Sequence, residues 1–197
     1  EMVGYSGVDF AVHESAGPEL DKECAKIVPL GLGTAKITRG YNLNAKYIIH
    51  TSGPIWRGGL EGESIILKSC YLESLKLAVG HGCTSIAFPL ISSGAYGYPK
   101  DRVLKFAVQT ITEFLFEHEL TVYLCVFDRT SYEFSQKLFS EINEFIDGND
   151  DDDGCNADDV RIMRNRVDQL LLRHGAVESI ANSHKDAVPE SCADAGE

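Results

Sequence analysis

The stretch Ser85–Pro99, which reads SIAFPLISSGAYGYP, decides the fold. Its first part, Ser85–Leu90, is short, rich in β-forming residues and apolar nearly throughout, which is typical of a strand buried on both faces of a parallel sheet. Its second part is a loop with two glycines and two serines, after which Pro99 opens a helical pattern over Asp101–Phe116. A strand, a glycine-rich loop and a helix in this order indicate an α/β unit.

The same alternation continues on both sides of this stretch. Two further apolar, β-rich segments, Lys46–His50 and Thr121–Phe127, are predicted strands, and Ser64–Val79 and Ser131–Ile146 have the apolar spacing of helices. Strands that alternate with helices form βαβ units with right-handed crossovers. The sequence therefore predicts an α/β fold, a three-layer α/β/α sandwich around a largely parallel, mixed central sheet.

Composition divides the chain into three parts. Of the 197 residues, 44% are hydrophobic, so residues 1–146 are expected to form one domain with a packed core. Residues 147–160 are predicted to be an acidic linker, because 147–159 carry seven acids and no base. A short helix and a disordered tail are predicted for residues 161–197.

The charge of the chain excludes some classes of function. A formal net charge of −12 argues against a DNA-binding protein, which needs lysine and arginine to neutralise phosphates. No apolar run approaches the ~20 residues of a membrane-spanning helix, so no membrane partner is expected.

Cysteine and histidine usage does not indicate a metal. The six cysteines show neither a C-x-x-C pair nor zinc-ligand spacing with a histidine. We interpret them as reduced core cysteines of a cytoplasmic protein, and we expect no metal and no cofactor. His50 is predicted to be a hydrogen-bonded core histidine rather than a catalyst, and His13 a packing or surface residue.

The loop Ile91–Pro99 is a candidate anion site, because ligands of open α/β sheets bind beyond the carboxyl ends of the strands. Its glycines let the backbone approach a ligand, and free N–H groups beside a helix N-terminus hold phosphate. The loop has no lysine or arginine before Lys100, so a phosphate would be held by amides. Tyr96 and Tyr98 offer flat faces for a ribose or a base. The alternative is a glycine-rich connector with two packing tyrosines.

Two more segments are candidates for the same site. Gly7-Val8-Asp9 precedes a helical run, so it is either a turn capped by its aspartate or a second loop whose aspartate holds a ribose hydroxyl or a water. Phe127 ends a predicted strand and either covers a nucleobase or closes the core. Asp128 is either a polar contact to the ligand or a helix cap.

Several of these motifs, taken in order, resemble a macrodomain. They are GTAKITRGYNL at 33–43, AKYIIHT at 45–51, Gly53-Pro54, the SIAFPLISSGAYGYP stretch and Val126-Phe127-Asp128. The resemblance covers about residues 3–146. It is greatest to the bacterial branch named for ADP-ribose-1″-phosphate processing, which includes O-acetyl-ADP-ribose deacetylases.

The resemblance implies an ADP-ribose ligand and assigns three groups of residues to it. The loop that would bind the diphosphate, with its tyrosine against the distal ribose, comprises Ser92, Ser93, Gly94, Ala95, Tyr96, Gly97 and Tyr98. The facing loop comprises Gly7, Val8 and Asp9. Phe127 would lie beside the adenine, followed by Asp128.

The resemblance leaves three functions open. Hydrolytic macrodomains release ADP-ribose from acidic side chains or from O-acetyl-ADP-ribose, and in them the aspartate that matches Asp9 acts with an upstream asparagine on the distal ribose and a water. The family's Gly-Asp-Ile and Asn-Ala-Ala-Asn segments do not occur here, so we expect the first strands of the sheet to be missing. The chain is then an ADP-ribosyl ester hydrolase with Asp9 as its catalytic residue, a non-catalytic reader, or an inactive remnant. The expected partner is ADP-ribose or an ADP-ribosylated protein, bound by a monomer.

Overall fold

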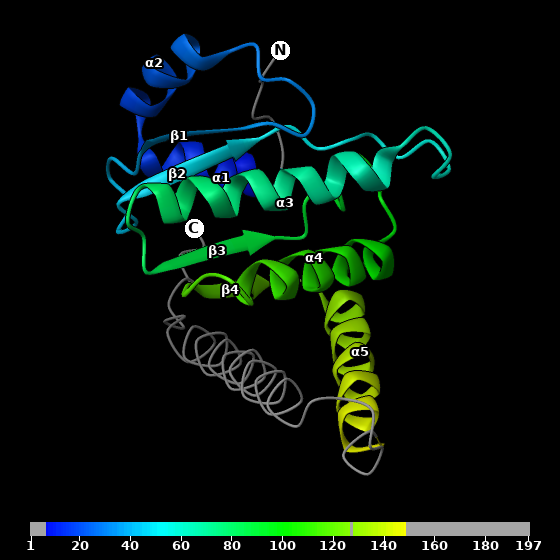
Figure 1. The fold of residues 1–197 in the computed structure, drawn as a ribbon. Helices are drawn as coiled ribbons and strands as arrows, with labels where there is room; N and C mark the ends of the chain where they lie inside the picture. Colours follow the sequence, from blue (N-terminus) through cyan, green and yellow to red (C-terminus); the bar gives the residue numbers. More distant parts are fainter. Residues whose placement is uncertain (1–6, 127, 149–197) are drawn as a thin grey trace, which may run out of the picture. The chain divides into compact units, whose positions relative to one another are not determined.

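The computed structural model describes residues 7–126 and 128–148, which Figure 1 shows as a coloured ribbon. Their elements are, in order, α1 (Gly7–Ala16), α2 (Pro18–Ile27), β1 (Ala35–Arg39), β2 (Tyr47–Thr51), α3 (Glu63–Gly80), β3 (Ser85–Pro89), α4 (Lys100–Leu115), β4 (Thr121–Cys125) and α5 (Arg129–Gly148). The first compact unit ends at Phe145. The predicted short helix and tail, and the predicted linker beyond residue 148, lie outside the described residues. None of the described helices is long and apolar enough to cross a membrane.

The strands and helices predicted within the described residues are present, with ends that differ by about two residues at most. Two elements were not predicted. Helix α2 begins directly after Gly17, with Pro18 in its first turn, where the fixed φ of proline suits a helix. Strand β1 carries Lys36 and Arg39 among few apolar residues, so its composition does not stand out as a strand.

The four described strands form two pairs. Strands β1 and β2 are antiparallel, with Ile37 opposite Ile49, because the short connection between them permits only a hairpin. Strands β3 and β4 are parallel, with Phe88 opposite Leu124, and α4 is the crossover that the sequence predicted. The α/β class is confirmed. The predicted single sheet differs from this result, because no ladder joins β2 to β3 among the described residues.

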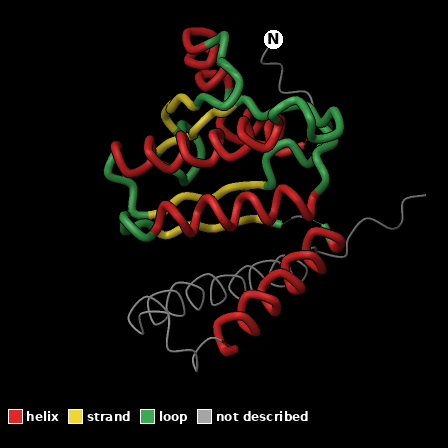
Figure 2. The backbone as a smooth tube through the Cα atoms, turned by 45° about the vertical axis from the view of Figure 1, so that its right-hand side comes forward, coloured by secondary structure: helices red, strands yellow, loops and turns green. Residues whose placement is uncertain are grey.

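Helix α3 connects the two strand pairs through side-chain packing. It packs against β1, β2 and β3 as well as α4, and Figures 1 and 2 show it running alongside both pairs. Its buried residues recur every three or four positions, as in a helix that turns one face to the core. They are Glu63, Leu67, Cys70, Tyr71, Ser74, Leu75 and Ala78.

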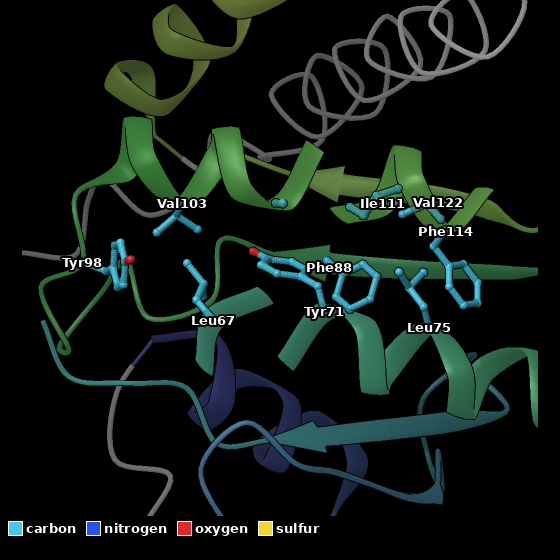
Figure 3. Packing of buried hydrophobic residues seen from close by; sticks show 10 residues of the cluster. Leu67, Tyr71, Leu75, Phe88, Tyr98, Val103, Ile111, Phe114 and Val122 are labelled. Atoms are coloured by element: carbon cyan, nitrogen blue, oxygen red, sulfur yellow. The ribbon is translucent and has the colours of Figure 1, made fainter. Parts of the chain in front are cut away.

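The main core lies between α3, α4 and one face of the β3–β4 pair (Figure 3). Phe88 and Val122 are buried on that face, whereas Ala87 and Tyr123 on the opposite face are exposed. The sequence predicted strands buried on both faces. The described residues depart from this prediction because α3 and α4 both pack on the face that carries Phe88 and Val122.

The hydroxyl of Tyr71 ties this core to the loop that follows β3. The ring is fully buried and meets the Phe88 ring edge-on, with 5.2 Å between ring centroids. The hydroxyl donates to the carbonyl oxygen of Pro89 at 3.3 Å and accepts a hydrogen bond from the N–H of Ile91 at 3.1 Å. Burial raises the pKa of the phenol, so the hydroxyl keeps its proton and both bonds persist over the ordinary pH range.

Replacing Tyr71 by Phe should destabilise the protein, because the N–H of Ile91 loses its acceptor beside the core. An unsatisfied buried polar group costs about 1–3 kcal/mol, and the free energy of unfolding measured in urea should fall by that amount. Tyr47→Phe is the matched control, since no hydrogen bond of the Tyr47 hydroxyl occurs among the described residues. Equal losses in the two variants would contradict this role for Tyr71.

Candidate functional site

The loop between β3 and α4 folds back on itself. The N–H of Gly97 donates to the carbonyl oxygen of Gly94 at 2.9 Å, and the N–H of Tyr98 donates to that of Ser92 at 3.0 Å. Ser92 adopts a φ of 65° and Gly97 a φ of 67°. This left-handed conformation costs a non-glycine residue about 1–2 kcal/mol, and the Ser92 hydroxyl is buried without a partner in the described part of the chain. Strain of this kind is typical of functional loops.

The tip of this loop presents backbone donors to solvent. Among the described residues, the N–H groups of Gly94, Ala95 and Tyr96 have no hydrogen-bond acceptor. All three residues are exposed, and a Cβ built at Gly94 or Gly97 would have no atom within 4 Å. The loop leads directly into the N-terminus of α4. Free amides beside a helix N-terminus favour a polyatomic anion such as phosphate.

The loop after β2 contacts the loop of residues 91–99 between β3 and α4, which we call the anion loop. The N–H of Trp56 donates to the carbonyl oxygen of Tyr96 at 2.9 Å. A Cβ added to Gly53 would lie 2.2 Å from the hydroxyl oxygen of Ser92. The two loops therefore touch at Gly53, where an added side chain would have to displace those of Ser92 and Ile91.

A buried carboxylate organises the second loop. Glu63, at the start of α3, accepts hydrogen bonds from the N–H groups of Arg57 at 3.1 Å, Gly59 at 3.0 Å and Glu61 at 2.7 Å. Its own backbone N–H and those of Gly59 and Arg57 hold the pKa of the Glu63 carboxyl below its usual range. Sequence reasoning missed this residue, although an acid at a helix start after several glycines is a signal for such a clamp.

The two tyrosines of the anion loop have different environments. The Tyr96 ring is half-exposed, whereas Tyr98 is 2% exposed and belongs to the core. The Tyr98 ring lies 4.6 Å from that of Trp56, and the Arg102 guanidinium lies 5.3 Å from the Trp56 ring. Of the two flat faces predicted from the sequence, only that of Tyr96 is open at the surface.

Asp128 is the N-cap of α5. Its carboxylate accepts hydrogen bonds from the N–H of Ser131 at 3.0 Å and from its hydroxyl at 2.8 Å. Lys100 at the start of α4 lies 2.9 Å from the same carboxylate. The hydrogen bond from Lys100, followed by that from Ser131, lowers the pKa of Asp128 to about 2. The helix-cap alternative is thus present in the structure, and Phe127 lies outside the described residues.

The N-terminal candidates lie in the first turn of α1. Gly7 has a φ of 69°, and Val8 and Asp9 are exposed. The Asp9 carboxylate lies 3.8 Å from the Nε2 atom of His13. Among the described residues, no hydrogen bond or ion pair joins Asp9 to the anion loop.

A second cluster of reactive side chains lies where α1, α2 and β2 meet. His13, Cys24 and His50 each bring one potential metal-ligand atom within 4.8 Å of the other two. His50 is buried with its Nε2 2.9 Å from the hydroxyl oxygen of Thr38, so the predicted hydrogen-bonded core histidine is confirmed. Sequence spacing missed the cluster because its members are far apart along the chain, with His50 26 positions after Cys24.

Comparison with known proteins identifies the family of this chain. The family model of the Macro domain matches residues 1–107. The chain belongs to the macrodomain family. This macrodomain is 48% identical over 143 residues to a Macro domain-containing protein of Methanosarcina mazei. The alignment covers 72% of this chain and 76% of the relative. The predicted resemblance and the α/β fold are thereby confirmed.

Two further relatives carry more specific names. The macrodomain is 39% identical over 146 residues to the O-acetyl-ADP-ribose deacetylase of Escherichia coli K12, over 71% of this chain and 82% of the relative. It superposes on the structure of an Oceanobacillus iheyensis macrodomain with ADP, with a TM-score of 0.68 and 37% sequence identity. That match covers 72% of this chain and 79% of the other.

The Asp128 helix cap should make the free energy of unfolding depend on pH in the acidic range. Its folded pKa lies below the unfolded value of about 3.9, so its contribution is present above that value and is lost as the pH falls towards 2. Asp128→Asn should therefore lower the urea midpoint at pH 7, and the difference from the parent should close between about pH 4 and pH 2. In a Lys100→Met background the same substitution should cost less. A pH-independent difference would contradict this assignment.

Proposed function

We propose that this macrodomain binds ADP-ribose through the anion loop and hydrolyses ADP-ribosyl esters, either O-acetyl-ADP-ribose or mono-ADP-ribose on aspartate and glutamate side chains. The observation that carries the proposal is the row of free N–H groups at Gly94, Ala95 and Tyr96, set in a strained loop at the start of α4. The relative named O-acetyl-ADP-ribose deacetylase and the related structure with ADP support the ligand class.

The charges around the loop favour binding by amides. Lys100, the nearest cation along the chain, is paired with Asp128, and Arg102 lies over the Trp56 ring. The whole chain carries a formal charge of −12, so long-range attraction of a diphosphate is absent. Short charge-assisted hydrogen bonds, worth about 1.5–3 kcal/mol each, would then supply the affinity.

The remaining candidates complete a path for the ligand. In this proposal Ser92, Ser93 and Gly97 shape the diphosphate loop, and the exposed Tyr96 ring lies against the distal ribose. Gly7, Val8 and Asp9 face it from α1. Phe127 lies beside the adenine, with Asp128 next to it, and Tyr98 supports the loop from the core.

The proposed chemistry is a simple hydrolysis. The bond between the acyl carbon and an oxygen of the distal ribose breaks. Water supplies a hydroxyl to the acyl carbon and a proton to the ribose oxygen, which gives a free acid and ADP-ribose. Asp9 orients the water and accepts its proton during the attack, a role that its exposed carboxylate in the first turn of α1 permits.

A non-catalytic reader is the second candidate. It is favoured by one observation, which is that no described contact connects Asp9 to the anion loop. A reader would bind ADP-ribose through the loop and release no product, whereas an inactive remnant would neither bind nor hydrolyse. Calorimetry with ADP-ribose and an assay of ester hydrolysis on the same preparation separate the three.

Gly97→Glu should abolish ADP-ribose binding, because the new side chain projects into the open space at the loop tip and brings a negative charge to the diphosphate. Calorimetry is expected to show at least a hundredfold weaker binding. Gly82→Glu is the matched control, since Gly82 also has a positive φ of 66° and no atom within 4 Å of an added Cβ, but lies in the turn after α3. If Gly97→Glu binds like Gly82→Glu, the anion loop is not the site.

Asp9→Ala should lower the rate of ADP-ribose release from O-acetyl-ADP-ribose while leaving ADP-ribose affinity within a few-fold. A general base contributes about 10²–10⁴-fold to a rate, so a loss in that range is expected in steady-state assays. Glu14→Ala, an exposed acid at the other end of α1, serves as the control. Unchanged turnover in Asp9→Ala would remove this residue from the mechanism, and binding without any turnover in the parent protein would establish the reader.

A further inference from the structure

The cluster of His13, Cys24 and His50 has the composition of a transition-metal site. One imidazole from α1, a thiol from α2 and one imidazole from β2 converge, and the Cys24 sulfur lies 3.8 Å from the Nε2 atom of His50. Cys24 and His50 are buried, and the His13 side chain is 19% exposed. Imidazole nitrogen and thiolate sulfur are the ligands that zinc prefers in proteins.

The separations between these atoms are close to those of a loaded site. Zinc lies about 2.0–2.1 Å from nitrogen and about 2.3 Å from sulfur, so neighbouring ligands of a tetrahedral ion are about 3.3–3.7 Å apart. The sulfur to Nε2 distance of 3.8 Å nearly meets this requirement, and all three ligand atoms lie within 4.8 Å of one another.

Asp21 prepares His13 for metal binding. The Nδ1 atom of His13 lies 2.6 Å from a carboxylate oxygen of Asp21, so an imidazole bound to an ion through Nε2 would donate its Nδ1–H to this carboxylate. A carboxylate that holds the outer nitrogen of a ligating histidine is a common feature of zinc sites, because it fixes the ring and raises its basicity. This contact is an observation independent of the three ligand atoms.

Ion binding would change two groups of the cluster. The Cys24 thiol would lose its proton to solvent, and the hydroxyl of Thr38 would give up its contact with Nε2 of His50.

We propose that His13, Cys24 and His50 bind one zinc-class divalent ion, with Asp21 as the carboxylate that orients His13 and water in the fourth position. The ion would link α1 and α2 to β2 and would stabilise the folded chain by mass action. The proposal does not rest on the proposed hydrolase or reader function, since none of its evidence involves the anion loop. The site was not predicted from the sequence, because spacing rules detect only ligands that are close along the chain.

Cobalt(II) titration of the full, chelator-treated chain tests the proposal. Binding at one ion per chain should produce a near-ultraviolet charge-transfer band from thiolate to cobalt together with tetrahedral d–d bands, and zinc should displace the cobalt. The charge-transfer band should disappear in Cys24→Ser and persist in Cys83→Ser, the matched control, because Cys83 lies in the turn before β3 outside the cluster. No stoichiometric binding, or the same spectrum in Cys24→Ser, would overturn the site.

Two milder variants protect the test against misfolding of Cys24→Ser. Asp21 and His13 are not fully buried, so Asp21→Asn and His13→Gln are expected to fold. Loss of an outer carboxylate costs about 10–100-fold in metal affinity, and Asp21→Asn should weaken cobalt binding within that range. His13→Gln should weaken it further. Unchanged cobalt affinity in both variants would overturn the proposal, whatever the outcome for Cys24→Ser.

Discussion

The two hydrogen bonds of the Tyr71 hydroxyl are the constraint on which the candidate site depends. A buried phenol on α3 fixes the last residue of β3 and the first residue of the anion loop, so the direction in which the chain leaves the strand is set by the core. The strained φ of Ser92 follows immediately. Such strain persists only where neighbouring contacts leave no alternative, and here they come from the Tyr71 hydroxyl, Trp56 and the close approach of Gly53.

The proposed anion site belongs to an acidic protein. Its positive ends are backbone dipoles, and the cations near the loop are already engaged, Lys100 with Asp128 and Arg102 with the Trp56 ring. Fixed amide dipoles act at short range and distinguish shape, whereas mobile lysines attract any polyanion from a distance. If the loop binds the proposed diphosphate, the positions of its amides rather than the net charge of the chain would set its selectivity.

The sequence predicted the elements whose signals are local. The apolar run before Ser92 and the proline at 99 define β3, the loop and α4 without reference to anything else in the chain. The clamp formed by Glu63 was missed, because the N–H groups that donate to its carboxylate belong to an irregular loop whose conformation has no regular sequence pattern. The grouping of Cys24 with His50 was equally inaccessible, since it depends on how α2 packs beside β2. Local sequence propensity predicts helices and strands, whereas the groupings of side chains depend on packing between segments that are distant in the sequence.

The clamp formed by Glu63 has a consequence for how a ligand is received. Three amide protons of a surface loop are hydrogen-bonded to a buried carboxylate, so they should exchange with solvent deuterium as slowly as those of the neighbouring helix. A loop held in this way loses little conformational entropy when a ligand arrives. A ligand that binds at this surface would then meet a loop that is already ordered in the folded protein.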